Sequence, residues 1–192
     1  MTVGAVLLAA GSGRRMGADK LMADLDGRPL ILHAFDAILA AGLDGPIVAT
    51  MPGGPIAALL EGRGRVVAVA DHALGMGHSL AAAMRAVPAD WTAAIICLAD
   101  MPFVATATLK ALVGAASPEA IVRPAFEGRP GNPVLWGRNH FPALASLTGD
   151  RGGRDLLARH PASSFPCNDP GVLIDIDTPE ALAEARKSFG RE

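Results

Sequence analysis

Hydrophobic residues occur along this chain in two alternating patterns: short continuous runs, and longer stretches with helical spacing. The first run, residues 3–10, ends abruptly in a segment rich in glycine and charge. Continuous runs bounded by turn residues predict buried strands, and repeats of three and four residues predict amphipathic helices. The expected strands cover residues 3–9, 46–50, 65–70, 93–98, 120–124 and 172–174. The expected helices cover residues 29–41, 55–61, 76–86, 105–115 and 179–189.

This alternation predicts an α/β fold with a doubly wound, mostly parallel sheet of the Rossmann-like kind, and ligands at the carboxyl ends of the strands. The 192 residues suffice for one domain with a sizeable core. The alternation is lost between Arg123 and Arg159, where glycine and proline are dense and PVLW is typical of a short strand. We expect an inserted hairpin and short helices there. An ordinary long connection is the alternative, although structureless loops of that length are uncommon.

Composition agrees with such a sheet and excludes several classes of protein. Hydrophobic residues make up 51% of the chain and aromatic residues 4%, so the core must consist mainly of Ala, Val, Leu and Ile. A formal net charge of -2 provides no basic field for nucleic acid or a membrane surface. The two cysteines form no CxxC pair, and Cys97 lies in an apolar run, so we expect neither disulfide nor zinc. No apolar run is long enough to span a membrane, and a cytoplasmic location is the default expectation.

The segment after the first run has the residues of a polyphosphate site. Gly11, Gly13 and Gly17 allow a tight turn whose backbone N–H groups can approach an anion, and Arg14, Arg15 and Lys20 supply positive charge. The spacing matches neither the Walker pattern nor the dinucleotide pattern GxGxxG. A basic surface loop is the alternative interpretation.

Several motifs together carry a family resemblance. The run LAAGSGRRMGADK resembles the signature LAAGxSxRMGxxK of the MobA-like nucleotidyltransferases of molybdenum cofactor biosynthesis. GMGHSL, LADMPFV, GRPGNPVLWG with TGDRGGRDLL, and IDIDTPEAL resemble the same family in the same order and span nearly the whole chain. The most similar branch is the molybdenum cofactor cytidylyltransferases, which transfer CMP from CTP to the phosphate of molybdopterin. Gly13 departs from the signature, because serine usually stands there, so we expect only a backbone contact at this position.

Three carboxylates are candidate ligands for Mg²⁺. Asp100 follows the apolar run 93–98 at an expected strand end, and Asp175 and Asp177 share one face of an extended segment. One or two carboxylates completed by substrate phosphates suit Mg²⁺. A helix cap is the alternative for Asp177, since it precedes Thr178 and Pro179.

These residues suggest a mechanism of positioning and charge neutralisation, with Arg15, Lys20 and Asp100 as the catalytic residues. An acceptor that is already a phosphate needs no protein nucleophile. Arg15 and Lys20 would hold the β- and γ-phosphates, and Asp100 would bind the metal. We expect one nucleotidyltransferase domain over residues 1–192, in which residues 1–100 mainly bind the nucleotide and residues 101–192 mainly bind the acceptor and carry the second metal segment. The expected nucleotide contacts are Leu8, Ala9, Ala10, Gly11, Gly13, Arg14, Arg15, Lys20, Gly75, Met76 and Ser79, and the expected acceptor contacts are Arg129, Asn132 and Arg154.

The donor and the acceptor depend on finer features. Cytidylyltransferases of the resembling family carry LAAG where guanylyltransferases carry LAGG, and this chain has Ala10 at the differing position. The resemblance also raises a molybdenum hydroxylase as recipient of the product. Transfer to a sugar or polyol phosphate, guanylyl transfer, and a non-catalytic chaperone or oxidoreductase on the same sheet remain alternatives.

Overall fold

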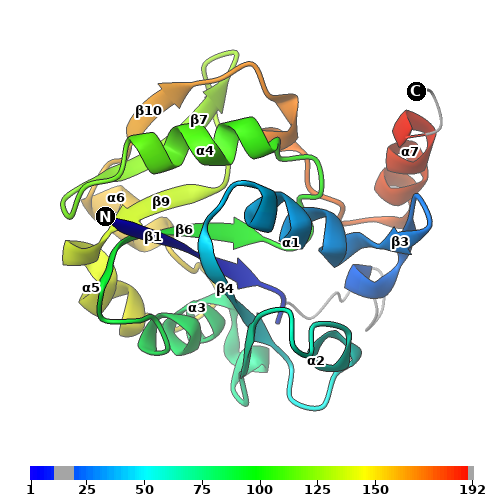
Figure 1. The fold of residues 1–192 in the computed structure, drawn as a ribbon, viewed down its shortest axis with the longest axis horizontal. Coiled ribbons are helices and arrows are strands. Elements are labelled where there is room, and N and C mark those ends of the chain that lie inside the picture. Colours follow the sequence, from blue (N-terminus) through cyan, green and yellow to red (C-terminus); the bar gives the residue numbers. More distant parts are fainter. Residues whose placement is uncertain (11–19, 190–192) are drawn as a thin grey trace.

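One mixed sheet forms the centre of the protein in a computed structural model that describes residues 1–10 and 20–189 (Figure 1). Its order is β10-β7-β9-β6-β1-β4-β5, with β8 paired to β7. Pairing is parallel except that β9 runs antiparallel to β6 and β7, and β8 to β7. The strands of this sheet are β1 (Thr2–Leu8), β4 (Asp44–Thr50), β5 (Arg65–Ala68), β6 (Trp91–Leu98), β7 (Ile121–Phe126), β8 (Arg129–Pro130), β9 (Val134–Gly137) and β10 (Ser163–Pro166). The expected α/β fold is therefore confirmed.

Helices cover both faces of the sheet, so the central strands are apolar on both sides. On β1, Ala5 and Leu7 pack into the core cluster that contains α1 and α4, whereas Val6 and Leu8 pack into the cluster that contains α3, α5 and α6. Burial of both faces explains why these strands appear in the sequence as continuous apolar runs. The helices are α1 (Leu30–Ala40), α2 (Pro55–Leu59), α3 (Met76–Arg85), α4 (Thr106–Gly114), α5 (Phe141–Ala145), α6 (Arg154–Arg159) and α7 (Pro179–Phe189).

The segment between β7 and α6 contains the inserted elements that the sequence predicts. β7 and β8 form a hairpin whose turn residues, Glu127 and Gly128, have φ of 49° and 76°. Two central residues with positive φ are typical of the tight turns that suit twisted hairpins. β9 then inserts between β6 and β7, and α5 and α6 follow. The segment is thus a hairpin with short helices rather than an irregular connection.

One expected strand is wrong, one strand of the main sheet was missed, and the separate two-stranded hairpin within residues 24–29 was not expected either. Residues 172–174 were expected to be extended, but Pro170–Leu173 forms a 3-10 helix (η4). Asp169 caps η4 by accepting a hydrogen bond from the Gly171 N–H at 2.9 Å, and it also binds the Thr108 hydroxyl at 2.6 Å. These tertiary contacts outweigh the local preference of the apolar residues. The missed strand, β10, is short, and its Ser163 and Ser164 are exposed at the edge of the sheet.

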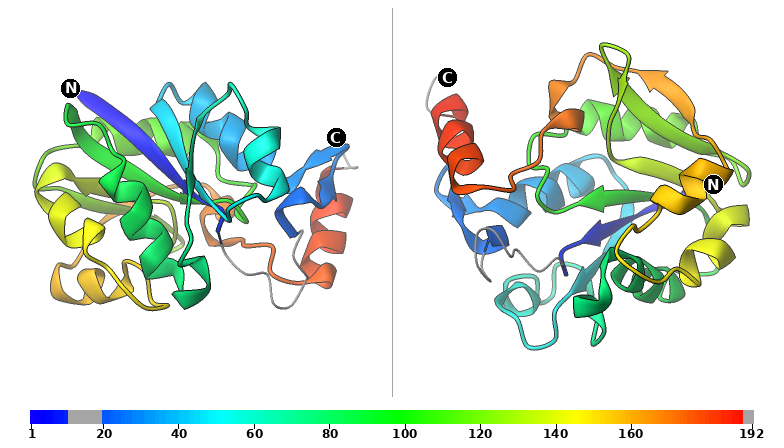
Figure 2. Two further views of the ribbon diagram at one scale, coloured as in Figure 1. Left: turned by 90° about the horizontal axis from the view of Figure 1, so that it is seen from below. Right: turned by 180° about the vertical axis from the view of Figure 1, so that it is seen from behind.

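A third apolar cluster lies apart from the two main ones. It joins α7 to a second hairpin, β2 (Asp24–Leu25) with β3 (Arg28–Pro29), through Leu25, Ile176 and Leu182. Figure 2 shows α7 beside this hairpin in both views. Arg186 on α7 donates from Nε and Nη2 to the Asp24 carbonyl oxygen at 2.9 and 2.7 Å. Segments from opposite ends of the sequence are thereby fixed together.

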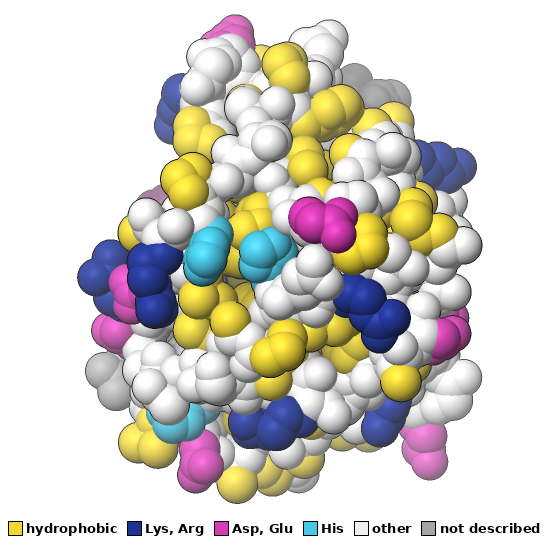
Figure 3. Space-filling model, turned by 90° about the vertical axis from the view of Figure 1, so that its left-hand side faces the viewer, with side chains coloured by type: hydrophobic (Ala, Val, Ile, Leu, Met, Phe, Trp, Pro, Cys, Tyr) yellow, Lys and Arg dark blue, Asp and Glu magenta, His cyan; other side chains and the backbone are white. Residues whose placement is uncertain are grey.

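The face drawn in Figure 3 carries basic side chains scattered among acidic and hydrophobic ones, with two histidines side by side near its centre. Such a mixture suits the small net charge of -2. In the described part of the chain, no helix has the length and apolar character needed to cross a bilayer.

Candidate active site

The candidate site lies at the carboxyl edge of the sheet, where β1 and β6 end side by side. Leu8 pairs with Leu98, and the Ala99 N–H donates to the Leu8 carbonyl oxygen at 3.1 Å. Asp100 therefore lies directly beside the end of the strand that leads into the glycine-rich segment. Within that segment, Gly11, Gly13, Arg14 and Arg15 lie outside the described residues, so their roles remain predictions.

Lys20 lies between two carboxylates from distant parts of the chain. Its Nζ is 2.9 Å from Asp100 Oδ2 and 2.6 Å from Asp177 Oδ1. The Lys20 side chain is 11% exposed, Asp100 26% and Asp177 51%. Burial by itself would lower the pKa of Lys20, but the charges and hydrogen bonds of Asp100 and Asp177 raise it above its ordinary value. Lys20 is therefore a fixed ammonium group among acids.

Asp175 completes the acidic side of the site. Burial raises the pKa of Asp175 above its ordinary range, and repulsion from Asp177 and then Asp100 adds to this. One lysine does not neutralise three carboxylates, and the excess negative charge is what a cation would relieve.

The backbone holds Asp177 in place, so the helix-cap alternative is not needed. The Ile176 N–H donates to the Asp100 carbonyl oxygen at 2.8 Å, and the Ile176 side chain is buried in the third cluster. Thr178 supplies the N-terminal cap of α7, because its Oγ1 accepts a hydrogen bond from the Ala181 N–H at 3.1 Å. The Asp177 carboxylate accepts from Lys20.

The described side chains do not make a complete metal site by themselves. Among them, no group of three or more His, Cys, Asp or Glu is arranged so that it could hold a metal ion. The donors present are nevertheless carboxylate oxygens, and they repel one another. Such a set fits Mg²⁺ or Mn²⁺ when phosphate oxygens of a substrate supply the remaining ligands.

The expected base-reading segment at Leu8, Ala9 and Ala10 is buried. The Ala9 N–H donates to the Ala49 carbonyl oxygen at 2.8 Å, and the Leu8 carbonyl oxygen accepts from the Ala99 N–H. These two backbone groups already form hydrogen bonds that extend the sheet, so they have less capacity to bind a nucleotide base. The predicted contact with the base therefore falls mainly to Ala10.

The GMG turn packs against the turn that precedes α6. Gly75 has φ of 121°, and the Gly77 N–H donates to the Gly149 carbonyl oxygen at 2.8 Å. A Cβ on Gly75 would lie 2.4 Å from that same oxygen, so only glycine fits this position. Met76 is 45% exposed beside the turn. Ser79, another expected nucleotide contact, is buried within α3, which begins at Met76 as expected.

Of the residues expected at the acceptor, Arg129 and Asn132 lie at a second turn, and Arg154 begins α6. Asn132 is fixed by its backbone, since its N–H donates to the Val172 carbonyl oxygen at 2.9 Å; Arg129 and Arg154 are exposed. Sequence reasoning missed Arg123, which donates from Nε and Nη2 to the Gly131 carbonyl oxygen at 3.1 and 2.9 Å. An arginine within the otherwise apolar segment IVRPAF was the available signal.

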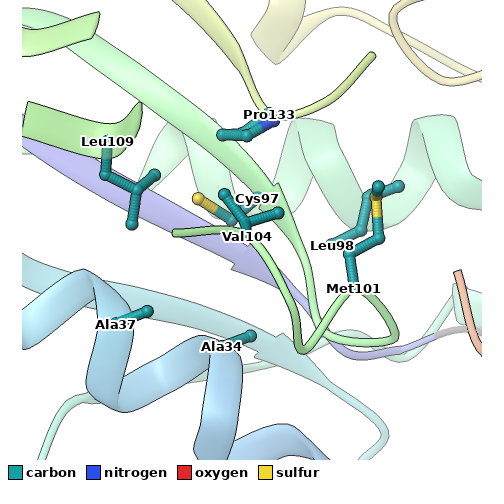
Figure 4. A pocket seen from close by; sticks show the side chains of 8 residues that line it. All are labelled: Ala34, Ala37, Cys97, Leu98, Met101, Val104, Leu109 and Pro133. Atoms are coloured by element: carbon teal, nitrogen blue, oxygen red, sulfur yellow. The ribbon is translucent and has the colours of Figure 1, made fainter. Parts of the chain in front are cut away.

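A small apolar pocket lies beside the end of β6, lined in part by Ala34, Val104 and Pro133. Figure 4 shows these side chains gathered around Cys97. Burial raises the pKa of the Cys97 thiol to about 12. Cys97 is therefore a buried, protonated thiol, as the sequence predicts, and takes no part in the polar site.

The chain is similar to several known proteins over most of its length. The model of the MobA-like NTP transferase domain matches residues 5–164. Purine catabolism protein PucB of Bacillus subtilis is 32% identical over 96% of this chain and 96% of its own length. Nicotine blue oxidoreductase of Paenarthrobacter nicotinovorans is 29% identical, over 92% of this chain and 93% of that protein.

A solved structure adds a bound metal to these similarities. The structure of Rv0371c from Mycobacterium tuberculosis H37Rv in complex with manganese has a TM-score of 0.79 and 27% identity, covering 98% of this chain and all of the other.

Proposed function

Since this chain belongs to the MobA-like NTP transferase family, and is a nucleotidyltransferase of that family, we propose that it transfers CMP from CTP to the phosphate of molybdopterin. The forms LAAG and GMG, which resemble those of the cytidylyl branch, support this choice of donor. The proposed acceptor rests on the motifs that resemble molybdenum cofactor enzymes along the rest of the chain.

The reaction is an in-line displacement at the α-phosphorus. An oxygen of the acceptor phosphate forms the new bond, the bond from the α-phosphorus to the bridging oxygen breaks, and pyrophosphate leaves. Because the attacking oxygen is already anionic, the protein has to position and neutralise charge rather than supply a nucleophile. The acidic cluster, with one ammonium group among three carboxylates, suits that task.

The described residues have distinct parts in this scheme. Asp100 and Asp177, with Asp175 beside them, would hold Mg²⁺, which when bound supplies positive charge at the triphosphate. Lys20 binds β- and γ-phosphate oxygens and stabilises the leaving pyrophosphate. Asn132 and Arg154 hold the acceptor beside the reacting phosphate.

The contact of Lys20 with Asp100 and Asp177 is the observation that carries this proposal most directly. It joins a phosphate-binding cation to two candidate metal ligands at one point, through ion pairs of 2.9 and 2.6 Å. A purely structural ion pair on the surface would contribute little to stability. The manganese in the related Rv0371c structure supports divalent-metal dependence of the same fold.

A second candidate function is redox chemistry on the same sheet, because one full-length relative is named an oxidoreductase. The two candidates differ in what they consume. Nucleotidyl transfer releases one pyrophosphate for each product, whereas an oxidoreductase needs a reductant and leaves the triphosphate intact.

The decisive experiment incubates the protein with each NTP, Mg²⁺ and either molybdopterin or its molybdenum-loaded form, followed by mass analysis of the product. We expect a CMP adduct and stoichiometric pyrophosphate, both lost in Asp100→Asn. Sugar and polyol phosphates serve as competing acceptors, and an adduct on one of these instead would replace molybdopterin in the proposal. Absence of pyrophosphate with every NTP and acceptor would overturn it.

A further inference from the structure

Two arginines close to the acceptor turn carry charges that no described carboxylate balances. Arg123, on β7, donates to the carbonyl oxygens of Gly131 at 3.1 and 2.9 Å and of Pro130 at 3.3 Å. These partners are neutral. Arg154, the first residue of α6, is exposed. The ion pairs found among residues 1–10 and 20–189 all join other groups.

Packing of α6 places Arg154 over the same face of the sheet as Arg123. A Cβ on Gly153 would lie 3.3 Å from the Trp136 ring, so the start of α6 lies against Trp136. Trp136 pairs with Ile121 across the sheet, and Arg123 follows on the same face of β7 two positions later. Burial and, next, the charge of Arg154 lower the pKa of Arg123. The two positive charges therefore repel each other in a partly dehydrated setting.

The same place adjoins the candidate active site. Asn132 is bound through its backbone to Val172, and Pro133 lines the small pocket together with Met101, which follows Asp100. Since Val134 pairs with Ile96, the turn that Arg123 fixes lies beside the carboxyl end of β6, where Asp100 follows.

We infer that Arg123 and Arg154 together form a subsite for a dianionic phosphate monoester, the reacting group of the acceptor. Two guanidinium groups match the charge of such a phosphate. Arg154 can donate two parallel bonds to its oxygens, and Arg123, whose Nε and Nη2 bind the Gly131 and Pro130 carbonyl oxygens, can donate from Nη1. Arg123 also fixes the turn that carries Asn132, so it links the phosphate to the part of the site that holds the rest of the acceptor. This inference rests on the proposed function, since it assigns the phosphate to the acceptor.

The test is a titration of the protein with inorganic phosphate, without nucleotide or metal, by calorimetry. Arg123→Met and Arg154→Met should each weaken phosphate binding by at least about tenfold, as expected for loss of a charge-assisted hydrogen bond. The double variant should lose little more than either single variant, because both side chains hold one anion. Lys20→Met distinguishes phosphate bound by the two arginines from phosphate bound by the glycine-rich segment. This variant should retain the phosphate binding that the two arginine variants lose.

Arg85→Met is the matched control, because Arg85 also donates to a backbone carbonyl, that of Ala145 at 2.8 Å, and lies outside the site. It should bind phosphate as the unaltered protein does. Arg154→Met decides the matter even if Arg123→Met fails to fold, since the Arg154 side chain makes no hydrogen bond or ion pair with the described residues. Unchanged phosphate affinity in Arg154→Met would overturn the subsite.

Failure of the subsite and failure of the proposed function give different results. If CMP transfer is observed and Arg123→Met and Arg154→Met leave the KM for the acceptor unchanged, the subsite is wrong and the function stands. If both variants lose phosphate binding but no NTP yields an adduct, the subsite stands and the proposed function is wrong.

Discussion

Lys20 Nζ lies 2.9 Å from Asp100 Oδ2, although the two residues are 80 positions apart in the sequence. Each was expected on separate grounds, the lysine for phosphate and the aspartate for metal. Their direct pairing means that the lysine occupies the space between carboxylates until other cations and anions compete for them.

Replacement of Lys20 by Met should lower kcat/KM by roughly 10²–10³-fold, because a donor to the developing charge is lost. The same change should strengthen binding of Mn²⁺ to the nucleotide-free protein, since no ammonium group competes for Asp100 and Asp177. Steady-state kinetics and Mn²⁺ titration by electron paramagnetic resonance measure the two effects. Weaker Mn²⁺ binding in Lys20→Met would show that the lysine does not compete with the metal.

The three carboxylates should not contribute equally. Asp100→Asn and Asp177→Asn should each reduce turnover at least about a hundredfold and raise the Mg²⁺ concentration needed for half-maximal rate, whereas Asp175→Asn should have a smaller effect. Asp100 and Asp177 are the two that share Lys20. Asp155→Asn is the control, because the ion pair that Asp155 makes among residues 1–10 and 20–189 is with Arg151, away from the cluster. Equal loss in all three cluster variants would contradict this order.

Asp175→Asn should stabilise the metal-free protein at neutral pH. Folding raises the pKa of Asp175, so its ionisation destabilises the folded protein. This loss of stability develops as the pH rises from the pKa of an unfolded Asp, about 3.9, through the raised pKa of the folded state. The variant lacks this loss, so its Tm should match that of the unaltered protein in acid and exceed it at neutral pH. Because the carboxyl is mostly exposed, we expect a difference of no more than about 2 °C. Thermal melting across a pH series with chelator tests this, and a lower Tm at neutral pH would contradict it.

The donor preference should favour CTP over GTP. The Ala10 methyl group, 1% exposed at the end of β1, narrows the space for a base, and discrimination by shape is worth on the order of 1–3 kcal/mol. Equimolar competition measures the ratio of kcat/KM values directly. A ratio at or below one would remove the cytidylyl assignment and leave nucleotidyl transfer intact.

The two cysteines should differ in reactivity towards a thiol reagent such as DTNB. Burial raises the pKa of Cys97 to about 12, whereas Cys167 is partly exposed. At pH 8 one thiol should react in the native protein and a second only after unfolding. In Cys167→Ser the native protein should then show no fast reaction. Fast labelling of that variant would mean that the apolar pocket opens readily.

The sequence predicts the central strands well because both their faces are buried and their apolar runs are unbroken. β1 and β6 lie in the middle of the sheet, where local pattern and tertiary environment agree. At the edge the two diverge: β10 has exposed serines, and residues 170–173 are turned by Asp169, whose carboxylate binds groups more than 60 positions away. A window of sequence contains no information about such a partner.

The site shows the same division. Asp100, Asp177 and Lys20 stand in motifs, so the resemblance and the strand ends together predict them. Arg123 has no motif, and the significance of its charge depends on Arg154, which α6 brings to it from another segment. His140 and His160 likewise come together, with ring centroids 5.7 Å apart, without any helical spacing between them.

The third apolar cluster affects the order in which parts of the fold can form during translation. Asp177 joins Lys20 across 157 positions, and Arg186 on α7 binds the Asp24 carbonyl oxygen a few residues from that lysine. On a translating ribosome the lysine emerges long before its partner, and closing a loop of that length costs entropy that no local contact offsets. A nascent chain can therefore complete the central strands while Lys20 still lacks Asp177, so the acidic cluster is assembled only after the strands of the sheet have been synthesised.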